Sequence, residues 1–214
     1  PAWNNEKLRA YMEQMGFESF LLASHDRGAR VAHRLAKDHP LRVRKLAVLD
    51  IIPTHKMFQI VNKEMATNTY HWFFLVQPYD FPERVIGADP DYFIRYRFNS
   101  VKNASNVFPT EAVSEYVRCF RDPASIHGTC EDYRAGASID LVHDEADLDK
   151  KVSCPLLALW SSTGYVGRTQ DVLQVWREYA TDVRGQSLPS GHYLAEEKPD
   201  ETYAVIREFF LDKG

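Results

Sequence analysis

The fold is decided by the stretch Ser19-Phe20-Leu21-Leu22-Ala23-Ser24-His25-Asp26-Arg27-Gly28-Ala29-Arg30-Val31-Ala32-His33-Arg34-Leu35. An apolar run, 20–23, stops at a turn of the form small-x-Asp-x-Gly, and a helical pattern with Val31 and Leu35 on one face follows directly. The stretch therefore predicts a strand, a tight turn and a helix.

The turn places Asp26 where a nucleophile can stand. In the nucleophile-elbow arrangement, the central residue of such a turn projects above the sheet, beside backbone N–H groups at the N-terminus of the helix. An aspartate there can displace a leaving group from carbon and form an ester that water later cleaves. Aspartate before glycine is also a common turn and capping residue, so this stretch alone leaves a plain strand–helix connection equally open.

Composition limits the class of protein. The chain has 214 residues, of which 44% are hydrophobic and 26% charged, and these values predict one globular domain with room for an insertion. The net charge of −4 and the absence of a basic block argue against a nucleic-acid or membrane partner. No apolar run is long enough to cross a bilayer, and residues 1–5 lack a signal-peptide layout, so we expect a cytoplasmic protein.

Metal and disulfide chemistry are not indicated. The eight histidines do not cluster like metal ligands, and the three cysteines are an odd number at uneven spacing without a Cys-x-x-Cys pair. We therefore expect no metal and no organic cofactor. The cysteines are Cys119, Cys130 and Cys154.

A second buried strand follows the first helix. Residues 43–53 read as an apolar strand that closes on Asp50 and a proline. Strand, helix and strand within about 35 residues form a βαβ unit, so the sheet is parallel and its functional edge lies at the carboxyl ends of the strands. Asp26 and Asp50 both fall at such ends.

The middle of the chain differs from its two ends in composition and pattern. Residues 54–139 are rich in aromatic side chains at helical spacing and are interrupted by prolines, with no convincing parallel strand. We interpret the segment as a helical cap inserted over the carboxyl edge of the sheet. The predicted organisation is an α/β core over 1–53, a cap over 54–139 and the α/β core again over 140–214.

The α/β rhythm then resumes and supplies a histidine. Strands are predicted at 155–160 and 183–188, separated by a helix over 169–180, and a last helix runs over 199–211. The turn after the last strand carries His192. Asp26, Asp50 and His192 thus follow in the order nucleophile, acid and base, although Asp50 and His192 taken singly are ordinary turn residues.

Five segments together resemble the haloacetate dehalogenases of the α/β-hydrolase superfamily, including the fluoroacetate dehalogenases. The resemblance runs through nearly the whole chain, and its Asp-Arg-Gly-Ala-Arg and His-Trp elements are more specific than a generic hydrolase signature. The segments are His25-Asp26-Arg27-Gly28-Ala29-Arg30-Val31, Leu46-Ala47-Val48-Leu49-Asp50-Ile51, Tyr70-His71-Trp72, Cys130-Glu131-Asp132-Tyr133-Arg134-Ala135-Gly136 and Ser190-Gly191-His192.

The resemblance implies a role for each residue near the elbow. Asp26 would attack the carbon that bears the halogen, and His192, oriented by Asp50, would activate the water that cleaves the ester to glycolate. Arg27 and Arg30 would hold the substrate carboxylate, for which arginine offers a bidentate fork. Without the resemblance, both arginines would be read as solvated charges on a helix face.

The resemblance also implies a halide site at His71, Trp72 and Tyr133. An indole N–H and a phenol O–H are neutral donors that can stabilise a small anion as charge develops. The alternative for these rings is ordinary packing inside the cap. Sequence does not rank fluoride against chloride.

The chain departs from the family pattern at its start. Ser24 stands at the first small position of the elbow, where the family usually has glycine. Family members begin with several strands and a helix that precede the first helix of this sequence, so we expect the sequence to be incomplete. A chain without these strands would leave the elbow strand at an apolar edge and would be poorly stable and weakly active.

Two other classes remain open. An epoxide hydrolase would share the aspartate nucleophile, the His–acid pair and the aromatic cap, but it has no need of two arginines beside the nucleophile. A non-catalytic binding remnant would keep only the fold and a carboxylate pocket. The expected partner is a small halogenated carboxylate, and the resemblance suggests a homodimer.

Overall fold

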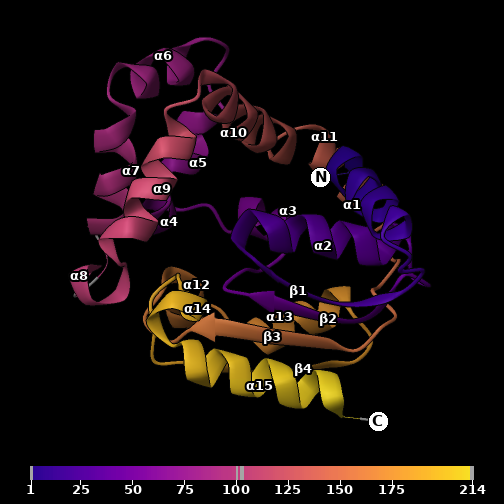
Figure 1. The fold of residues 1–214 in the computed structure, drawn as a ribbon. Helices are drawn as coiled ribbons and strands as arrows, with labels where there is room; N and C mark the ends of the chain where they lie inside the picture. The colour runs from indigo at the N-terminus through magenta and orange to yellow at the C-terminus, as the bar shows by residue number, and fades with distance from the viewer. Residues whose placement is uncertain (1, 100, 102–103, 213–214) are drawn as a thin grey trace. The chain divides into compact units, whose positions relative to one another are not determined.

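The computed structural model describes residues 2–99, 101 and 104–212 (Figure 1). The chain divides into two compact units, one formed by 1–61 with 140–214 and the other by 62–139. The segment 54–61, which the sequence analysis assigns to the insertion, groups with the first unit.

The first unit is built on a parallel sheet, as the sequence predicts. Its four strands lie in the order β1-β2-β3-β4, and every neighbouring pair is parallel. β1 forms one edge of this sheet and β4 the other. The strands are β1 (Phe20–His25), β2 (Val43–Leu49), β3 (Leu156–Ser161) and β4 (Val183–Leu188).

The central strands are buried on both faces, which explains why they read as continuous apolar runs. Alternate residues point to opposite faces, so Ala47, Leu49, Leu157 and Leu159 share one face and pack with Phe209 of the last helix. On β2, Leu46 and Val48 face the other way and are fully buried. Figure 1 shows the last helix, α15, on one side of the sheet and α2 on the other.

The helices of the first unit include those that the sequence predicts, with one shifted start, and several short helices that it does not predict. The helix expected over 169–180 starts later, as α13, because the Asp171 side chain accepts a hydrogen bond from Gln174 N at 2.9 Å and caps the helix there; a separate short helix, α12, precedes it. The set is α1 (Ala2–Gln14), α2 (Asp26–Asp38), α3 (Thr54–Gln59), α11 (Ile139–Ala146), α12 (Tyr165–Thr169), α13 (Val172–Tyr179), α14 (Leu194–Glu197) and α15 (Pro199–Leu211).

The regular structure of the second unit is entirely helical over its described residues, as the helical spacing of its aromatic side chains predicts. Prolines stand at the starts of helices, where the missing N–H is not needed. Aromatic pairs fill the spaces between the helices, as Phe98 and Phe108 do with their ring centroids 4.8 Å apart. The helices are α4 (Lys63–Asn68), α5 (Tyr70–Leu75), α6 (Phe81–Ala88), α7 (Pro90–Asn99), α8 (Ala104–Val107), α9 (Thr110–Phe120) and α10 (Pro123–Gly136). Over the described part of the chain, no helix has the length and apolar character to span a membrane.

A buried ion-pair network ties α2 to its neighbours. Lys37, whose side chain is almost fully buried, donates to Asp147, and Arg34 donates to Asp147 at 2.6 Å and to Asp38. Asn5 of α1 donates to the same Asp38 carboxylate at 2.6 Å. Because each buried charge has a partner of opposite sign, the network avoids the penalty of an isolated buried ion.

His33 lies beside this network but is not one of its ion-paired residues. Its ring packs edge-on against Trp176, with the ring centroids 5.3 Å apart, and only 5% of the residue is exposed. Burial lowers the pKa of His33, and the charges of Lys37 and Arg34 lower it further, to about 3. His33 is therefore neutral in the folded protein.

We expect His33 to make the protein less stable in mild acid. Since the unfolded histidine takes up a proton below pH about 6.5 and the folded one does not, the free energy of unfolding should fall by up to roughly 1.4 kcal/mol per pH unit as the pH decreases from that value. His33→Gln, which cannot titrate, should lose less stability between pH about 7 and about 5 in urea unfolding. The matched control is His143→Gln in α11, and equal losses in wild type and His33→Gln would contradict the assignment.

Candidate functional site

The elbow takes the strained form that the sequence predicts. β1 ends at His25, and Asp26, the first residue of α2, has φ +46°, a left-handed conformation that non-glycine residues rarely adopt. Ser24 fits at the small position, and its hydroxyl donates to the backbone carbonyl of Ala47 at 3.4 Å. Beyond its chain neighbours and the backbone of its own helix, a Cβ added to Gly28 would meet no described atom within 4 Å.

Asp50 occupies the same kind of position after β2. It also has a positive φ, +52°, and its side chain is mostly buried. Oδ1 accepts a hydrogen bond from the backbone N–H of Ser161 at 2.8 Å, and Oδ2 accepts one from His192 Nδ1 at 2.7 Å. Both oxygens are therefore held, and the carboxylate has one orientation.

His192 lies between the two aspartates. While Nδ1 donates to Asp50, Nε2 lies 3.6 Å from Asp26 Oδ2. The structure thus brings together Asp26, Asp50 and His192, which stand 24 to 166 residues apart in the sequence. Their meeting follows from the parallel sheet, because the carboxyl ends of its strands lie along one edge.

The two ionisable partners shift each other's pKa. Burial alone would lower the pKa of His192, but hydrogen bonds and charges from Asp26 and Asp50 outweigh it and raise the pKa well above its ordinary value. Burial alone would raise the pKa of Asp26, but His192, followed by the charges of Arg30 and His25, lowers it far below the usual range. At neutral pH the resting pair is a carboxylate facing an imidazolium.

Two residues near this centre escaped the sequence analysis. Ser161 ends β3 and is fully buried; its hydroxyl donates to Ser190 O at 2.6 Å and accepts from Gly164 N at 2.7 Å. Glu197 accepts from the backbone of the His192 loop. The first polar residue after an apolar strand is a signal that could have pointed to Ser161, whereas no pattern marks Glu197.

His25 contacts the same loop from the other side. Its Nε2 lies 2.8 Å from the His192 carbonyl oxygen, and because a carbonyl only accepts, Nε2 carries the proton. Burial and the charge of His192 lower the pKa of His25, so its ring is neutral at physiological pH.

The two arginines differ in their surroundings. Arg30 is buried in α2, and its Nη1 donates to Ile52 O at 3.0 Å and to Thr54 Oγ1 at 3.1 Å. Its charge also contributes to the low pKa of Asp26. Arg27 is half-buried in the first turn of α2.

In the second unit, the three residues predicted to bind halide form one ring cluster. His71 and Trp72 lie on α5 and Tyr133 on α10. The Tyr133 ring meets the His71 ring edge-on at 5.8 Å between centroids and the Trp72 ring at 6.0 Å. Trp72 and Tyr133 are buried.

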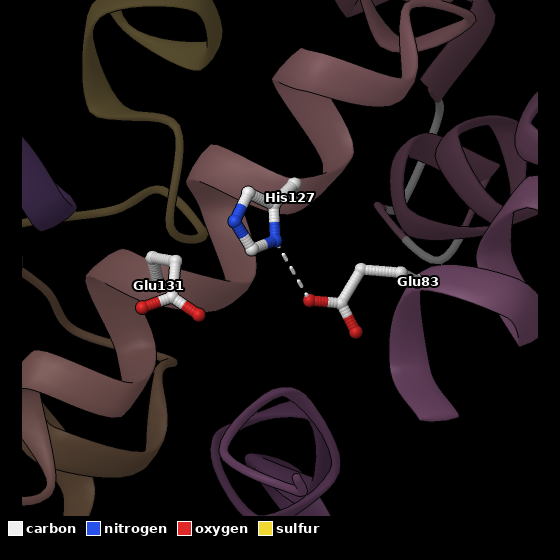
Figure 2. Close-up of side chains that lie close together, drawn as sticks. All are labelled: Glu83, His127 and Glu131. Carbon is white, nitrogen blue, oxygen red and sulfur yellow. Dashed lines mark hydrogen bonds and ion pairs between the residues drawn. The ribbon is translucent and has the colours of Figure 1, made fainter. Parts of the chain in front are cut away.

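Another group in the second unit has the side chains of a metal site but is occupied by an arginine. Glu83, His127 and Glu131 converge from α6 and α10, with His127 Nδ1 3.1 Å from Glu83 Oε1 (Figure 2). Arg134 Nη1 donates to Glu83 and to Glu131, at 2.6 Å in each case, and Nη2 donates again to Glu83. The guanidinium already neutralises both carboxylates, so the group is an ion-pair network.

Comparison with known proteins places the chain among hydrolases. A fluoroacetate dehalogenase from Burkholderia sp is 45% identical over 205 residues, which cover 95% of this chain and 67% of the relative. A soluble epoxide hydrolase from Corynebacterium sp. (strain C12) is 29% identical over 208 residues, covering 95% of this chain and 71% of that protein. No family model matches the chain.

Solved structures agree with the fold. The crystal structure of a protein from Nostoc sp PCC 7120, assigned to the α/β hydrolases, has a TM-score of 0.95 and 54% identity, and the match covers 97% of this chain and 72% of that one. The expected α/β-hydrolase fold is thereby confirmed. With 45% identity to a fluoroacetate dehalogenase over 95% of its length, the chain belongs to the haloacetate dehalogenase family of α/β hydrolases, enzymes that hydrolyse carbon–halide bonds.

Proposed function

We propose that this protein converts haloacetates, fluoroacetate and chloroacetate among them, to glycolate and halide by way of an ester on Asp26. The observation that carries the proposal is the position of His192, which is held by Asp50 at 2.7 Å and faces Asp26 at 3.6 Å. Asp26 stands at the strained turn of an elbow, where its carboxylate needs no base to become a nucleophile.

In the first step an Asp26 oxygen attacks the carbon that bears the halogen. The new C–O bond forms as the carbon–halogen bond breaks, and the halide leaves with the bonding electrons. The charge of Arg30, which already acts on Asp26, and that of Arg27 would hold the substrate carboxylate beside the attacking oxygen. Binding through charge orients the small substrate and lowers the entropic part of the barrier.

In the second step His192 becomes a base because the first step removes the charge that keeps it protonated. An esterified Asp26 is neutral, so one of the two carboxylates that raise the pKa of His192 is lost and the imidazolium releases its proton. Neutral His192 then takes a proton from water, which attacks the ester carbonyl. Glycolate leaves with a proton, and the net products are glycolate, halide and one proton.

The proposal assigns the departing halide to the ring cluster of His71, Trp72 and Tyr133. An indole N–H and a phenol O–H are neutral donors that stabilise an anion without prior charge. Their benefit is largest where charge develops most in the transition state, as it does when the strong carbon–fluorine bond breaks.

A homodimer and a cytoplasmic location are further parts of the proposal. Cys119, Cys130 and Cys154 are free thiols, which suits a reducing compartment. Sedimentation of the purified protein would establish the oligomeric state.

Epoxide hydrolysis is the second candidate, because a soluble epoxide hydrolase and an epoxide hydrolase 4 match the sequence of this chain at 29% and 21% identity. The two activities differ in the charge of the substrate. An epoxide is neutral and gains nothing from Arg27, whereas a haloacetate carries a carboxylate.

We expect Asp26→Asn to abolish halide release, with a loss of at least about 1,000-fold, because an amide is a poor nucleophile. His192→Asn should still release one halide per protein and then stop, since the ester forms but its water is not activated. Fluoride release and intact-protein mass spectrometry measure both effects, with His143→Gln as the control. Continued turnover by Asp26→Asn would show that water attacks the substrate directly.

We expect Arg27→Gln to raise KM for bromoacetate by roughly 10-fold or more, in line with the loss of a charge-assisted contact. The same change should leave KM for bromoacetamide, which has the same reacting carbon and no charge, within about twofold. Steady-state halide release on the two substrates makes the comparison. Equal effects on both, together with turnover of a neutral epoxide, would favour the epoxide hydrolase.

We expect Trp72→Phe to slow fluoroacetate more than bromoacetate. The ring stays, but the N–H donor is lost, which should reduce kcat for fluoroacetate by roughly 10-fold to 100-fold. The ratio of kcat for the two substrates is the measurement, because a general loss of folded enzyme cancels in it. An unchanged ratio would mean that the indole only packs.

A further inference from the structure

A single carboxylate holds the backbone on both sides of His192. Glu197, the last residue of α14, accepts the Gly191 N–H through Oε2 at 2.7 Å and the Tyr193 N–H through Oε1 at 3.0 Å. Hydrogen bonds to an ionised acceptor are the stronger kind. The two peptide groups that flank the histidine are thus fixed to one side chain.

Gly191 leaves the space that this contact needs. A Cβ at position 191 would lie 2.8 Å from Glu197 Oε1 and 3.0 Å from Oε2, closer than side-chain atoms approach each other. A larger residue at position 191 would therefore displace the carboxylate from this contact.

The carbonyl groups of the loop are held separately. Ser190 O accepts from Ser161 Oγ at 2.6 Å and from Thr163 Oγ1 at 2.9 Å, and His192 O lies 2.8 Å from His25 Nε2. These contacts bind carbonyl groups, whereas Glu197 binds the N–H groups of Gly191 and Tyr193. Together they fix the path of residues 190–193.

We propose that Glu197 is a positioning residue for the hydrolytic step: by binding the N–H groups of Gly191 and Tyr193, it holds the His192 ring between Asp50 and Asp26. The inference rests on the proposed function. Asp26 attacks from the turn after β1, which Glu197 does not contact in the described hydrogen bonds, so formation of the ester depends little on Glu197. Cleavage of the ester depends on His192 and therefore on Glu197.

The test compares Glu197→Gln with Glu201→Gln. Glutamine has one acceptor oxygen in place of two and cannot take the two N–H groups on separate oxygens as Glu197 does, whereas Glu201 is exposed, pairs with Lys198 and gives the same change of charge. In Glu197→Gln we expect kcat for fluoroacetate to fall roughly 10-fold to 100-fold, the loss that a small misplacement of a catalytic group produces. Mass spectrometry of rapidly quenched turnover should show the esterified protein accumulating in Glu197→Gln and not in Glu201→Gln.

Gly191→Ala supplies a second route to the same result. The added methyl displaces the carboxylate and should also accumulate ester, and combining it with Glu197→Gln should add little, because both remove one interaction. A lower kcat without accumulation of ester would overturn the proposal, since loss of folded protein slows both steps alike. Wild-type turnover in Glu197→Gln would overturn it as well.

A readout without substrate separates this inference from the proposed function. The Nδ1 proton of His192, hydrogen-bonded to Asp50, should give a downfield proton resonance in wild type and Glu201→Gln that broadens or disappears in Glu197→Gln. A resonance unaffected by Glu197→Gln would refute the positioning role. If wild type releases no halide, the proposed function fails, and this resonance still decides whether Glu197 positions His192.

Discussion

The arrangement of the first unit depends on one contact. The imidazole of His192 is held between the carboxylates of Asp50 and Asp26. Three segments must end at one place for this contact to form, and a parallel sheet is the architecture that brings strand ends from distant parts of a chain to one edge. Asp50 is almost buried and would be expensive to leave unpaired, so the Ser161 N–H and His192 both bind it. The negative charge of Asp26 is in turn matched by the imidazolium and by Arg30.

Backbone strain concentrates at the same two aspartates. Both have positive φ values, a conformation that costs an L-residue roughly 1–2 kcal/mol. Such strain persists where the surroundings over-determine the conformation. Here a buried sheet precedes each aspartate, and hydrogen bonds to Asp50 fix its side chain, so the turn cannot relax without breaking them. The strained turn directs each carboxylate towards His192, and the regular strands before it supply the rigidity.

Sequence reasoning recovered the parts of this arrangement that depend on strands. Buried parallel strands read as apolar runs, and Asp26, Asp50 and His192 each follow such a run, so their meeting at one edge could be predicted. Glu197, Ser161 and His25 bind backbone groups of the histidine loop, and a sequence pattern does not say which side chain a given backbone group will meet. The start of α13 was predicted too early for a related reason, because the capping contact of Asp171 depends on the local path of its turn. Interactions with the peptide backbone were therefore the ones that sequence could not reveal.

The charges near the elbow bear on the choice between a haloacetate and an epoxide. In the resting state the carboxylates of Asp26 and Asp50 are matched by the imidazolium of His192 and the guanidinium of buried Arg30, which acts on Asp26. This set of four groups is neutral, so a neutral epoxide would add no charge to it. A haloacetate brings one further negative charge, and leaving that charge unmatched in a site of low dielectric would be costly. Under the proposal that Arg27, in the first turn of α2, binds the substrate carboxylate, its guanidinium would supply the charge that a haloacetate needs and an epoxide does not.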